Sequence, residues 1–347
     1  MKSEIPHKLL KEPEVKEQKN TRVLVTGANG LLGAHVVRCL LSEGYRVLAM
    51  VRKGSNLKAL EGLDVDWFEG NVTDKEDVVR AVKQSDFVIH TAARTTQSPS
   101  SLEAYRKANI NSTQYLVEAA EKFGIQRMVY VSTANCFGNG SKEHPGNENT
   151  PFIPWLKRSG YAYSKLLAQQ LVLDSVRQKK VDAVIVNPTF LIGENDVKPS
   201  SGEVFLHVVN KRLVFYPPGG KNFVDAAMAA KGVVAALEKG RTGECYLLTG
   251  ENLSYREFFE KVISVTQQRP VFVPIPSWLL KCAGFAGDLL EKYLRLPVRL
   301  TRVNAGMLCL GNYFTSEKAV KELGFRELPV QESVEKAILW FQKNNYL

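Results

Sequence analysis

The sequence is short of the residues that form disulfides or bind structural metals. Its 347 residues include five scattered cysteines, an odd number without a CxxC pair, and five histidines without metal-ligand spacing. A disulfide framework or a zinc site needs paired or closely spaced ligands. We therefore expect reduced thiols, no bound metal and a cytoplasmic protein.

Long apolar runs are missing as well. No stretch reaches the roughly 18 apolar residues that indicate a membrane-spanning helix. The N-terminal residues 1–20 mix Lys and Glu with two prolines and lack the apolar centre of a signal peptide. We expect this segment to form a charged, disordered tail.

The charge is basic, with 46 Lys and Arg against 36 Asp and Glu. Such a balance can indicate nucleic acid or an anionic membrane as a partner. Here the cations are dispersed, and no basic stripe is interleaved with aromatic residues. We therefore expect a small-molecule substrate, no nucleic acid and no membrane, and leave a homodimer open.

Short apolar runs alternate with helical patterns in the first half of the chain. The runs lie at 22–26, 45–51, 86–93, 127–134 and 182–193, with a late one at 244–250. Continuous apolar runs are typical of parallel strands that are buried on both faces. The pattern predicts an α/β fold with a doubly wound parallel sheet, the Rossmann fold.

The alternation breaks in the second half of the chain. We expect an NAD(P)-binding Rossmann domain at 21–192, to which 222–250 returns. Residues 193–221 and 251–347 then form a smaller, mostly helical substrate-binding cap. Within the cap we expect an amphipathic helix at 277–294, whose apolar face could otherwise contact a membrane.

The motif "TGANGLLG" places Gly27, Gly30 and Gly33 directly after the first strand and at the start of a helix. In a dinucleotide site the first glycine allows a tight turn, the second lets the backbone approach the pyrophosphate, and the third lets the helix pack on the strand. The helix N-terminus supplies free N–H groups for the phosphates. The motif therefore predicts a dinucleotide cofactor.

The end of the second strand lacks the carboxylate that usually holds the ribose hydroxyls of NAD. In its place stand Arg52, Lys53 and, further on, Lys58. A 2′-phosphate would be held by Arg52, so we favour NADP(H) as the cofactor, with NAD(H) as the alternative. Arg52 could also be a solvated loop cation.

The motif "YAYSK" places Tyr161 and Lys165 on one face of a helix. A phenol, with a pKa near 10, needs activation for proton transfer at neutral pH, and a nearby ammonium lowers its pKa. Lys165 can also hold the nicotinamide ribose. Thr133, after the strand in "VSTANCFG", would bind the reacting oxygen.

These motifs, together with "HTAA", "NINST" and "VNPTFLIG", occur in the order and spacing of the extended short-chain dehydrogenase/reductase family. The chain resembles that family over about residues 21–345, and most of all its dihydroflavonol reductase-like branch; sugar-nucleotide epimerases share much of the pattern. The resemblance implies that Tyr161 is the acid/base, with Lys165 as its partner. It also implies that Thr133 is the catalytic hydroxyl and that Asn109 supports a proton relay.

The predicted cofactor contacts gather at the glycine turn, the strand ends and the acid/base pair. They are Gly27, Asn29, Gly30, Leu31, Leu32, Gly33, Arg52, Asn71, Val72, Thr91, Ala92, Ala93, Tyr161, Lys165, Asn187 and Pro188. Asn71-Val72 stands where the family often has Asp followed by Leu or Val, and Phe137 where epimerases often have Tyr. His90 is expected to be a hydrogen-bonded strand-end residue and not a catalyst.

Three functions remain open. The first is an NADP(H)-dependent reductase of a ketone or aldehyde on a small molecule. The second is an NAD-retaining nucleotide-sugar epimerase or dehydratase, against which Arg52 argues and for which a diphosphate pocket would be needed. The third is a non-catalytic NADP-binding sensor, which would have no need of Tyr161 and Lys165.

Overall fold

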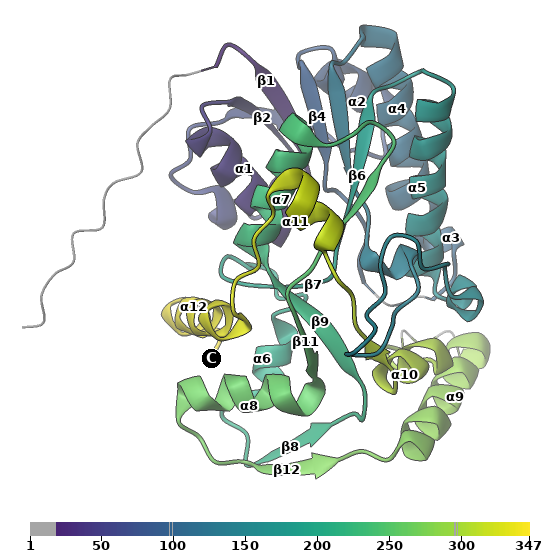
Figure 1. The fold of residues 1–347 in the computed structure, drawn as a ribbon, viewed down its shortest axis with the longest axis vertical. Helices are drawn as coiled ribbons and strands as arrows, with labels where there is room; N and C mark the ends of the chain where they lie inside the picture. The colour runs from purple at the N-terminus through teal and green to yellow at the C-terminus, as the bar shows by residue number, and fades with distance from the viewer. Residues whose placement is uncertain (1–18, 97, 99, 295, 297) are drawn as a thin grey trace, which may run out of the picture.

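The computed structural model describes residues 19–96, 98, 100–294, 296 and 298–347 (Figure 1). Residues 1–18 of the expected tail 1–20 lie outside the described residues. Lys19, at its end, is joined to the folded chain, because its backbone N–H donates to the carbonyl of Gly44 at 2.7 Å. Its ammonium also pairs with Glu238 at 3.2 Å.

Seven parallel strands form the main sheet, in the order β10-β6-β5-β4-β1-β2-β3. Their bounds are β1 (Arg22–Thr26), β2 (Arg46–Val51), β3 (Asp66–Glu69), β4 (Phe87–His90), β5 (Arg127–Val131), β6 (Ala183–Pro188) and β10 (Cys245–Leu248). The central strands are buried on both faces, which explains their continuous apolar runs. The predicted doubly wound parallel sheet is confirmed.

Helices cover the two faces of this sheet. One face packs against α1 (Leu31–Ser42), α7 (Ala226–Lys239) and α11 (Glu317–Leu323), and the other against α2 (Lys75–Val82), α4 (Ser112–Phe123) and α5 (Gly160–Arg177). Alternate residues of each strand point to opposite faces. Val23 and Val25 of β1 therefore enter the first core, and Leu24 enters the second.

Over the described ranges, two small sheets and five helices form the cap, in the lower half of Figure 1. A mixed sheet contains β7 (Phe190–Ile192), β9 (Gly220–Asp225), β11 (Glu251–Ser254) and β13 (Gly311–Asn312), and a two-stranded parallel sheet pairs β8 (Leu213–Tyr216) with β12 (Val271–Pro274). The helices are α6 (Glu203–Val208), α8 (Tyr255–Thr266), α9 (Ser277–Leu294), α10 (Arg302–Leu308) and α12 (Val330–Lys343). The helix expected at 277–294 is present. No helix among the described residues is both long and apolar enough to cross a bilayer.

The cap has a core of its own, rich in aromatic rings. Phe223 of β9 stacks on Phe258 of α8, with ring centroids 3.9 Å apart. Phe205 of α6 and Phe341 of α12 pack beside them, with centroids 5.7 Å apart. These rings join four separate segments of the chain into one cluster.

The division between the halves is more interleaved than the sequence predicts. Within 222–250, α7 and β10 lie with the main sheet, but β9 pairs only with cap strands. Within 251–347, α11 packs on α7, and its residues Ala319 and Leu323 belong to the core of the main sheet. The amphipathic α11 was assigned to the cap because nothing local to its sequence marks its partner.

The side chain of Asn222 joins the segments in which the chain passes between the main sheet and the cap. The amide of Asn222, on β9, donates to the carbonyl of Gly250 at 2.8 Å, and its oxygen accepts from the backbone N–H of Gly250 at 2.8 Å. The same oxygen accepts from the hydroxyl of Thr189 at 2.6 Å. Asn222 thus joins the segments after β6 and β10, where both leave the main sheet.

Candidate active site

The glycine turn between β1 and α1 leaves no room for side chains at two of its three glycines. Gly27 has φ +68°, and a Cβ there would lie 2.7 Å from the backbone of Ala92. A Cβ at Gly33 would lie 2.1 Å from the carbonyl of Gly27. Both glycines are therefore required by the turn and by the close packing of α1 on β1.

Gly30 differs, because it has φ −79° and a Cβ there would meet only the carbonyl of Gly27, at 3.3 Å. No side chain caps α1, and no acidic residue lies in its first turn. The first N–H groups of the helix are thus left for an external acceptor, which suits a phosphate. Leu31 is half-buried, whereas Leu32 packs into the sheet core, so that only its backbone could face a cofactor.

The loop after β2 lies beside this turn. The amide of Asn29 donates to the carbonyl of Asn56 at 3.1 Å, which joins the turn to the loop that begins at Arg52. The guanidinium of Arg52 is exposed and has no partner within the described part of the chain. It is free to bind an anion near the cofactor's adenosine end.

Asn71 and Val72, after β3, are placed less favourably for contact with a cofactor. The side-chain oxygen of Asn71 accepts from the backbone N–H of Thr73 at 3.1 Å, so it closes its own turn. Its amide group remains available. Val72 packs on the sheet core.

The residues after β4 meet the glycine turn from the other side. The hydroxyl of Thr91 donates to the carbonyl of Thr26 at 2.7 Å, and Ala92 and Ala93 follow it in half-buried positions. Small residues here let the chain pass close to Gly27. The three lie where the resemblance expects the cofactor.

His90 is buried between two hydroxyls. Its Nδ1 lies 2.8 Å from the hydroxyl of Thr26, and its Nε2 lies 3.2 Å from that of Thr113. Burial lowers the pKa of His90 to about 3, so the ring is neutral under ordinary conditions. The hydrogen-bonded strand-end position predicted for His90 is confirmed, and its lack of a catalytic role stays a prediction.

The three principal catalytic candidates come together where β5 ends and α5 begins. Ser159 caps α5 by accepting from the N–H of Ala162, which fixes Tyr161 in the first turn. Thr133, just past β5, lies beside the Tyr161 hydroxyl. Lys165, one turn further along α5, donates to the carbonyl of Val131 at 2.6 Å.

The neighbouring Ser132 points elsewhere. Its hydroxyl lies 3.3 Å from the buried thiol of Cys136. Thr133, and not Ser132, therefore faces the phenol.

The two titratable groups have displaced pKa values. Burial raises the pKa of Tyr161 to about 12, although the neighbouring Thr133 side chain acts in the opposite direction. Burial lowers the pKa of Lys165 to about 7. The sequence argument expected Lys165 to lower the pKa of the phenol, but Lys165 is not among the groups that set it. The reason is that its ammonium lies against the Val131 carbonyl and over the Tyr130 ring, 4.3 Å from the centroid.

Asn109 is fully buried in the π-helical segment η2 (Arg106–Asn111). Its amide donates to the hydroxyl of Ser164 at 2.9 Å, and its oxygen accepts from the N–H of Arg94 at 2.7 Å. Ser164 in turn donates to the carbonyl of Tyr161 at 2.8 Å. Asn109 thus joins the loop after β4 to the first turn of α5. Its role in a proton relay remains a prediction.

Asn187, near the end of β6, makes hydrogen bonds that hold the site in place. Its amide donates to the carbonyl of Thr133 at 2.9 Å and to the side chain of Gln169 at 2.8 Å. Its own oxygen is buried, without a hydrogen-bond partner in the ranges that the structure describes. Asn187 therefore positions Thr133, and Pro188 beside it is also buried.

Sequence reasoning missed Ser164, Gln169 and Arg94. Gln169 lies four residues beyond Lys165, as Lys165 lies four beyond Tyr161, so the spacing along α5 could have indicated it. Ser164 stands inside the "YAYSK" motif. Nothing in the local sequence of Arg94 points to Asn109.

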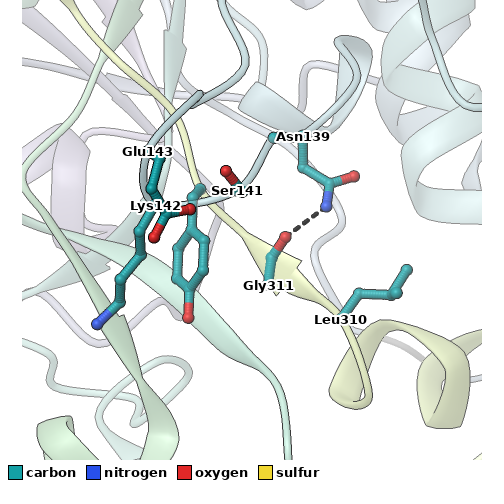
Figure 2. Close-up of a pocket in the computed structure, with 8 residues that line it drawn as sticks. Asn139, Ser141, Lys142, Glu143, Leu310 and Gly311 are labelled. Atoms are coloured by element: carbon teal, nitrogen blue, oxygen red, sulfur yellow. Dashed lines mark hydrogen bonds between the residues drawn. The ribbon is translucent and has the colours of Figure 1, made fainter.

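A separate surface hollow of about 450 Å³ lies between the loop 139–143 and β13. Figure 2 shows Lys142 and Glu143 on one side of it and Leu310 and Gly311 on the other. The amide of Asn139 donates to the carbonyl of Gly311 across it. None of the predicted site residues lines this hollow, so it adds nothing to the site at α5.

Known proteins resemble this chain over most of its length. Residues 23–248 match the model of the NAD dependent epimerase/dehydratase family. A relative from Synechocystis, provisionally named a dihydroflavonol 4-reductase, is 30% identical over 93% of this chain and 95% of its own.

Solved structures agree. The crystal structure of gox2253 superposes with a TM-score of 0.83 and 31% identity, covering 94% of this chain and 100% of that one. The structure of PA4631, a nucleoside-diphosphate-sugar epimerase from Pseudomonas aeruginosa, has a TM-score of 0.78 and 27% identity, covering 95% and 100%.

Proposed function

Because the chain belongs to the NAD dependent epimerase/dehydratase family, we propose that it is an NADP(H)-dependent reductase of a ketone or aldehyde group on a small molecule. The observation that carries the proposal is the placement of Tyr161 in the first turn of α5, beside Thr133 at the end of β5 and one turn before Lys165. This group lies at the carboxyl end of the sheet, the edge at which the glycine turn also opens.

The chemistry follows from the residues present. The open N-terminus of α1 and the side-chain-free glycine turn fit a dinucleotide pyrophosphate. A reduced nicotinamide, when bound, supplies a hydride to the carbonyl carbon. Tyr161 donates its phenolic proton to the oxygen of that carbonyl, and Thr133 hydrogen-bonds to the same oxygen.

Burial keeps the phenol of Tyr161 protonated at neutral pH, with a pKa of about 12, so a proton is present for transfer to the carbonyl oxygen. The positive charge of an oxidised nicotinamide and of Lys165 would lower this pKa.

The choice of NADP(H) rests on Arg52. Its guanidinium stands free directly after β2, and Lys53 and Lys58 follow in the same loop. All the charged side chains that this loop could present to a 2′-phosphate are cations. NAD(H) lacks that phosphate and would gain nothing from Arg52.

A nucleotide-sugar epimerase or dehydratase that retains NAD is the second candidate. One observation favours it: Lys221 of β9 lies over the Phe190 ring, 4.2 Å from the centroid, and burial lowers its pKa to about 8. Lys221 has no acidic partner in the described ranges of the chain, so a diphosphate could pair with it. A family name that includes epimerases adds support.

The test is the substitution Tyr161→Phe, with Tyr163→Phe as the matched control on the same helix. We expect Tyr161→Phe to slow single-turnover NADPH oxidation with an accepted carbonyl compound by at least about 100-fold, the usual loss for a general acid. Tyr163→Phe should stay near the wild-type rate. Equal rates for wild type and Tyr161→Phe would contradict the mechanism.

The same purified protein can be used to distinguish the reductase from the epimerase and the sensor. Denatured protein that releases stoichiometric NAD(H), with conversion of nucleotide sugars, would favour the epimerase. Tight NADPH binding without turnover of any carbonyl compound in a broad panel would favour the sensor.

A further inference from the structure

Helix α9 presents an apolar face to solvent. Trp278, Phe285 and Tyr293, exposed to 66%, 48% and 69%, follow one another at helical spacing. Leu289, exposed to 40%, lies between the last two. Phe285 contacts the guanidinium of Arg302, 5.1 Å from its ring centroid, and the face is otherwise largely exposed in the part of the chain that the structure describes.

Contacts on the opposite face of α9 determine which side of the helix is exposed. A Cβ at Gly284 would lie 2.8 Å from the carbonyl of Thr301, and one at Gly287 would lie 2.0 Å from that of Leu300. The two glycines therefore let α9 lie directly on the chain before and at the start of α10. The helix cannot rotate to bury its aromatic residues without breaking these contacts.

The two-stranded sheet that precedes α9 also carries exposed apolar side chains. Leu213 of β8 and Val271 of β12 stand opposite each other in register and are exposed to 53% and 60%. Phe215, two residues on from Leu213, shares its face and is also exposed. In Figure 1, β8, β12 and α9 lie together at the lower end of the cap, away from the main sheet.

The charges on this end of the cap are positive. Lys281 and Lys292 flank the apolar face of α9, and Lys211, Arg212 and Arg269 stand at the ends of β8 and β12; all five are exposed. No carboxylate pairs with any of them in the part of the chain that the structure describes. The cations are therefore available to an anionic partner.

Both carboxylates of α9 are turned toward the protein instead. Asp288 pairs with Arg302 at 2.5 Å. Glu291 accepts from the backbone N–H of Ser100 at 2.7 Å and from its hydroxyl at 2.6 Å. An apolar strip with free cations and no free carboxylate on its helix is the composition of an interfacial membrane-binding surface.

We propose that this end of the cap docks on the surface of an anionic lipid bilayer. The docking surface is defined by Leu213, Phe215, Val271, Trp278, Phe285, Leu289 and Tyr293, with Lys281 and Lys292 at its edge. Tryptophan and tyrosine suit the boundary between headgroups and acyl chains, and the lysines pair with lipid phosphates. The expectation of no membrane partner rested on a search for a stripe along the sequence, whereas this surface is assembled from separate segments.

The docking surface is held firmly to the catalytic half. The carbonyl of Ser100, whose N–H and hydroxyl bind Glu291 of α9, accepts from the N–H of Gly160 at 2.9 Å. Gly160 immediately precedes Tyr161. Docking through α9 therefore sets the orientation of the active site relative to the bilayer.

The experiment is vesicle flotation with the full chain. Vesicles of phosphatidylcholine alone are compared with vesicles that also contain phosphatidylglycerol. We expect wild type to float with the anionic vesicles, to bind the neutral ones at least about tenfold more weakly, and to lose binding as salt is raised. Failure to bind the anionic vesicles at low salt would overturn the proposal.

Paired substitutions test the two components of the surface. Phe285→Gln with Leu289→Gln should weaken binding at least about tenfold, while Leu339→Gln, at a leucine on α12 that is more exposed (64%), should leave it unchanged. Lys281→Glu with Lys292→Glu should remove the preference for anionic lipid. The matched control is Lys83→Glu with Lys343→Glu, which changes the net charge equally at exposed sites elsewhere. Equal losses in test and control variants would overturn the proposal.

A second measurement reports contact directly. Trp278 fluorescence should shift to shorter wavelength on anionic vesicles, and Trp278→Phe should remove that shift. If wild type instead dimerises without binding vesicles, and Phe285→Gln with Leu289→Gln yields monomers, the surface binds a second copy of the chain and the proposal is wrong.

Discussion

The two halves of the molecule are filled with different side chains. The cores on either side of the main sheet consist mostly of Val, Ala, Leu and Ile, for example Val129 and Ile185 on adjacent strands. The cap core contains a cluster of aromatic rings among its aliphatic residues, with Phe223 and Phe258 stacked in it. Aliphatic strands can be recognised in the sequence as runs, whereas the rings of the cap come from segments that are far apart in the chain. The two halves also differ in what they present. The main-sheet half presents backbone groups that fit a cofactor, whereas the cap is held together by the packing of large side chains.

The sharpest test of the cofactor half is Gly30→Val. The backbone of Gly30 is ordinary and its surroundings are open, so the variant should fold with an unchanged circular dichroism spectrum. The valine would occupy the place of the pyrophosphate, so fluorescence titration should detect no NADPH binding. Gly30→Ala should show an intermediate loss. Unchanged affinity in a folded Gly30→Val protein would place the cofactor elsewhere.

In the cap, Phe258→Ala tests the aromatic core. Phe258 is fully buried and stacks on Phe223, so its truncation should lower the free energy of unfolding by about 3–5 kcal/mol. The matched change in the sheet is Val129→Ala, which removes less apolar volume and should cost about 2 kcal/mol at most. Urea denaturation followed by circular dichroism measures both. If Val129→Ala lowers the free energy of unfolding more than Phe258→Ala does, the contrast between the two cores is wrong.

Arg52→Glu examines the cofactor half at a single charge. A carboxylate facing the 2′-phosphate should weaken NADPH binding by about tenfold to a hundredfold, while NADH binding changes little. Lys53→Glu, the adjacent residue with the same charge change, serves as the control and should have a smaller effect. A wild type that prefers NADH, or a variant with equal losses for both cofactors, contradicts the NADP assignment.

The smallest expected effect concerns pH. Lys165 has a pKa of about 7 and is charged below that value, when it can donate to the ribose hydroxyls most strongly. NADPH affinity should therefore weaken as the pH rises above 7, by at most about tenfold per pH unit. His90, with a pKa of about 3, does not titrate in this range. Fluorescence titration of Lys165→Met should show weaker but pH-independent binding above pH 7, and a persisting slope there would assign the effect to another group.

The contrast between the halves also explains what could be predicted. The strands of the main sheet, the glycine turn and the pairing of Thr133 with Tyr161 depend on motifs that lie directly at a strand end or a helix start. The cap's mixed sheet was not predicted. Its strands are short, β13 having only two residues, and their partners are far apart in the chain.

The supporting residues of the site were missed for a similar reason. Asn187 and Gln169 contact each other from β6 and α5, and only the fold brings them beneath Thr133. The effect of burial on the pKa of Tyr161 could not be predicted from the sequence either. Proximity along a helix indicates neighbours, but the direction of the Lys165 ammonium, toward the Val131 carbonyl, depends on the strand beside it.

The interleaving of the two halves limits how such a protein can be cut or recombined. The chain leaves the sheet after β6, returns at α7, leaves again after β10 and returns once more at α11. A single recombination point cannot exchange one cap for another, and a fragment that ends after β10 would strip α11 from α7. Exchange of the whole cap would therefore need several crossovers, whereas point substitutions and loop insertions in the cap leave the packing of α11 on α7 intact.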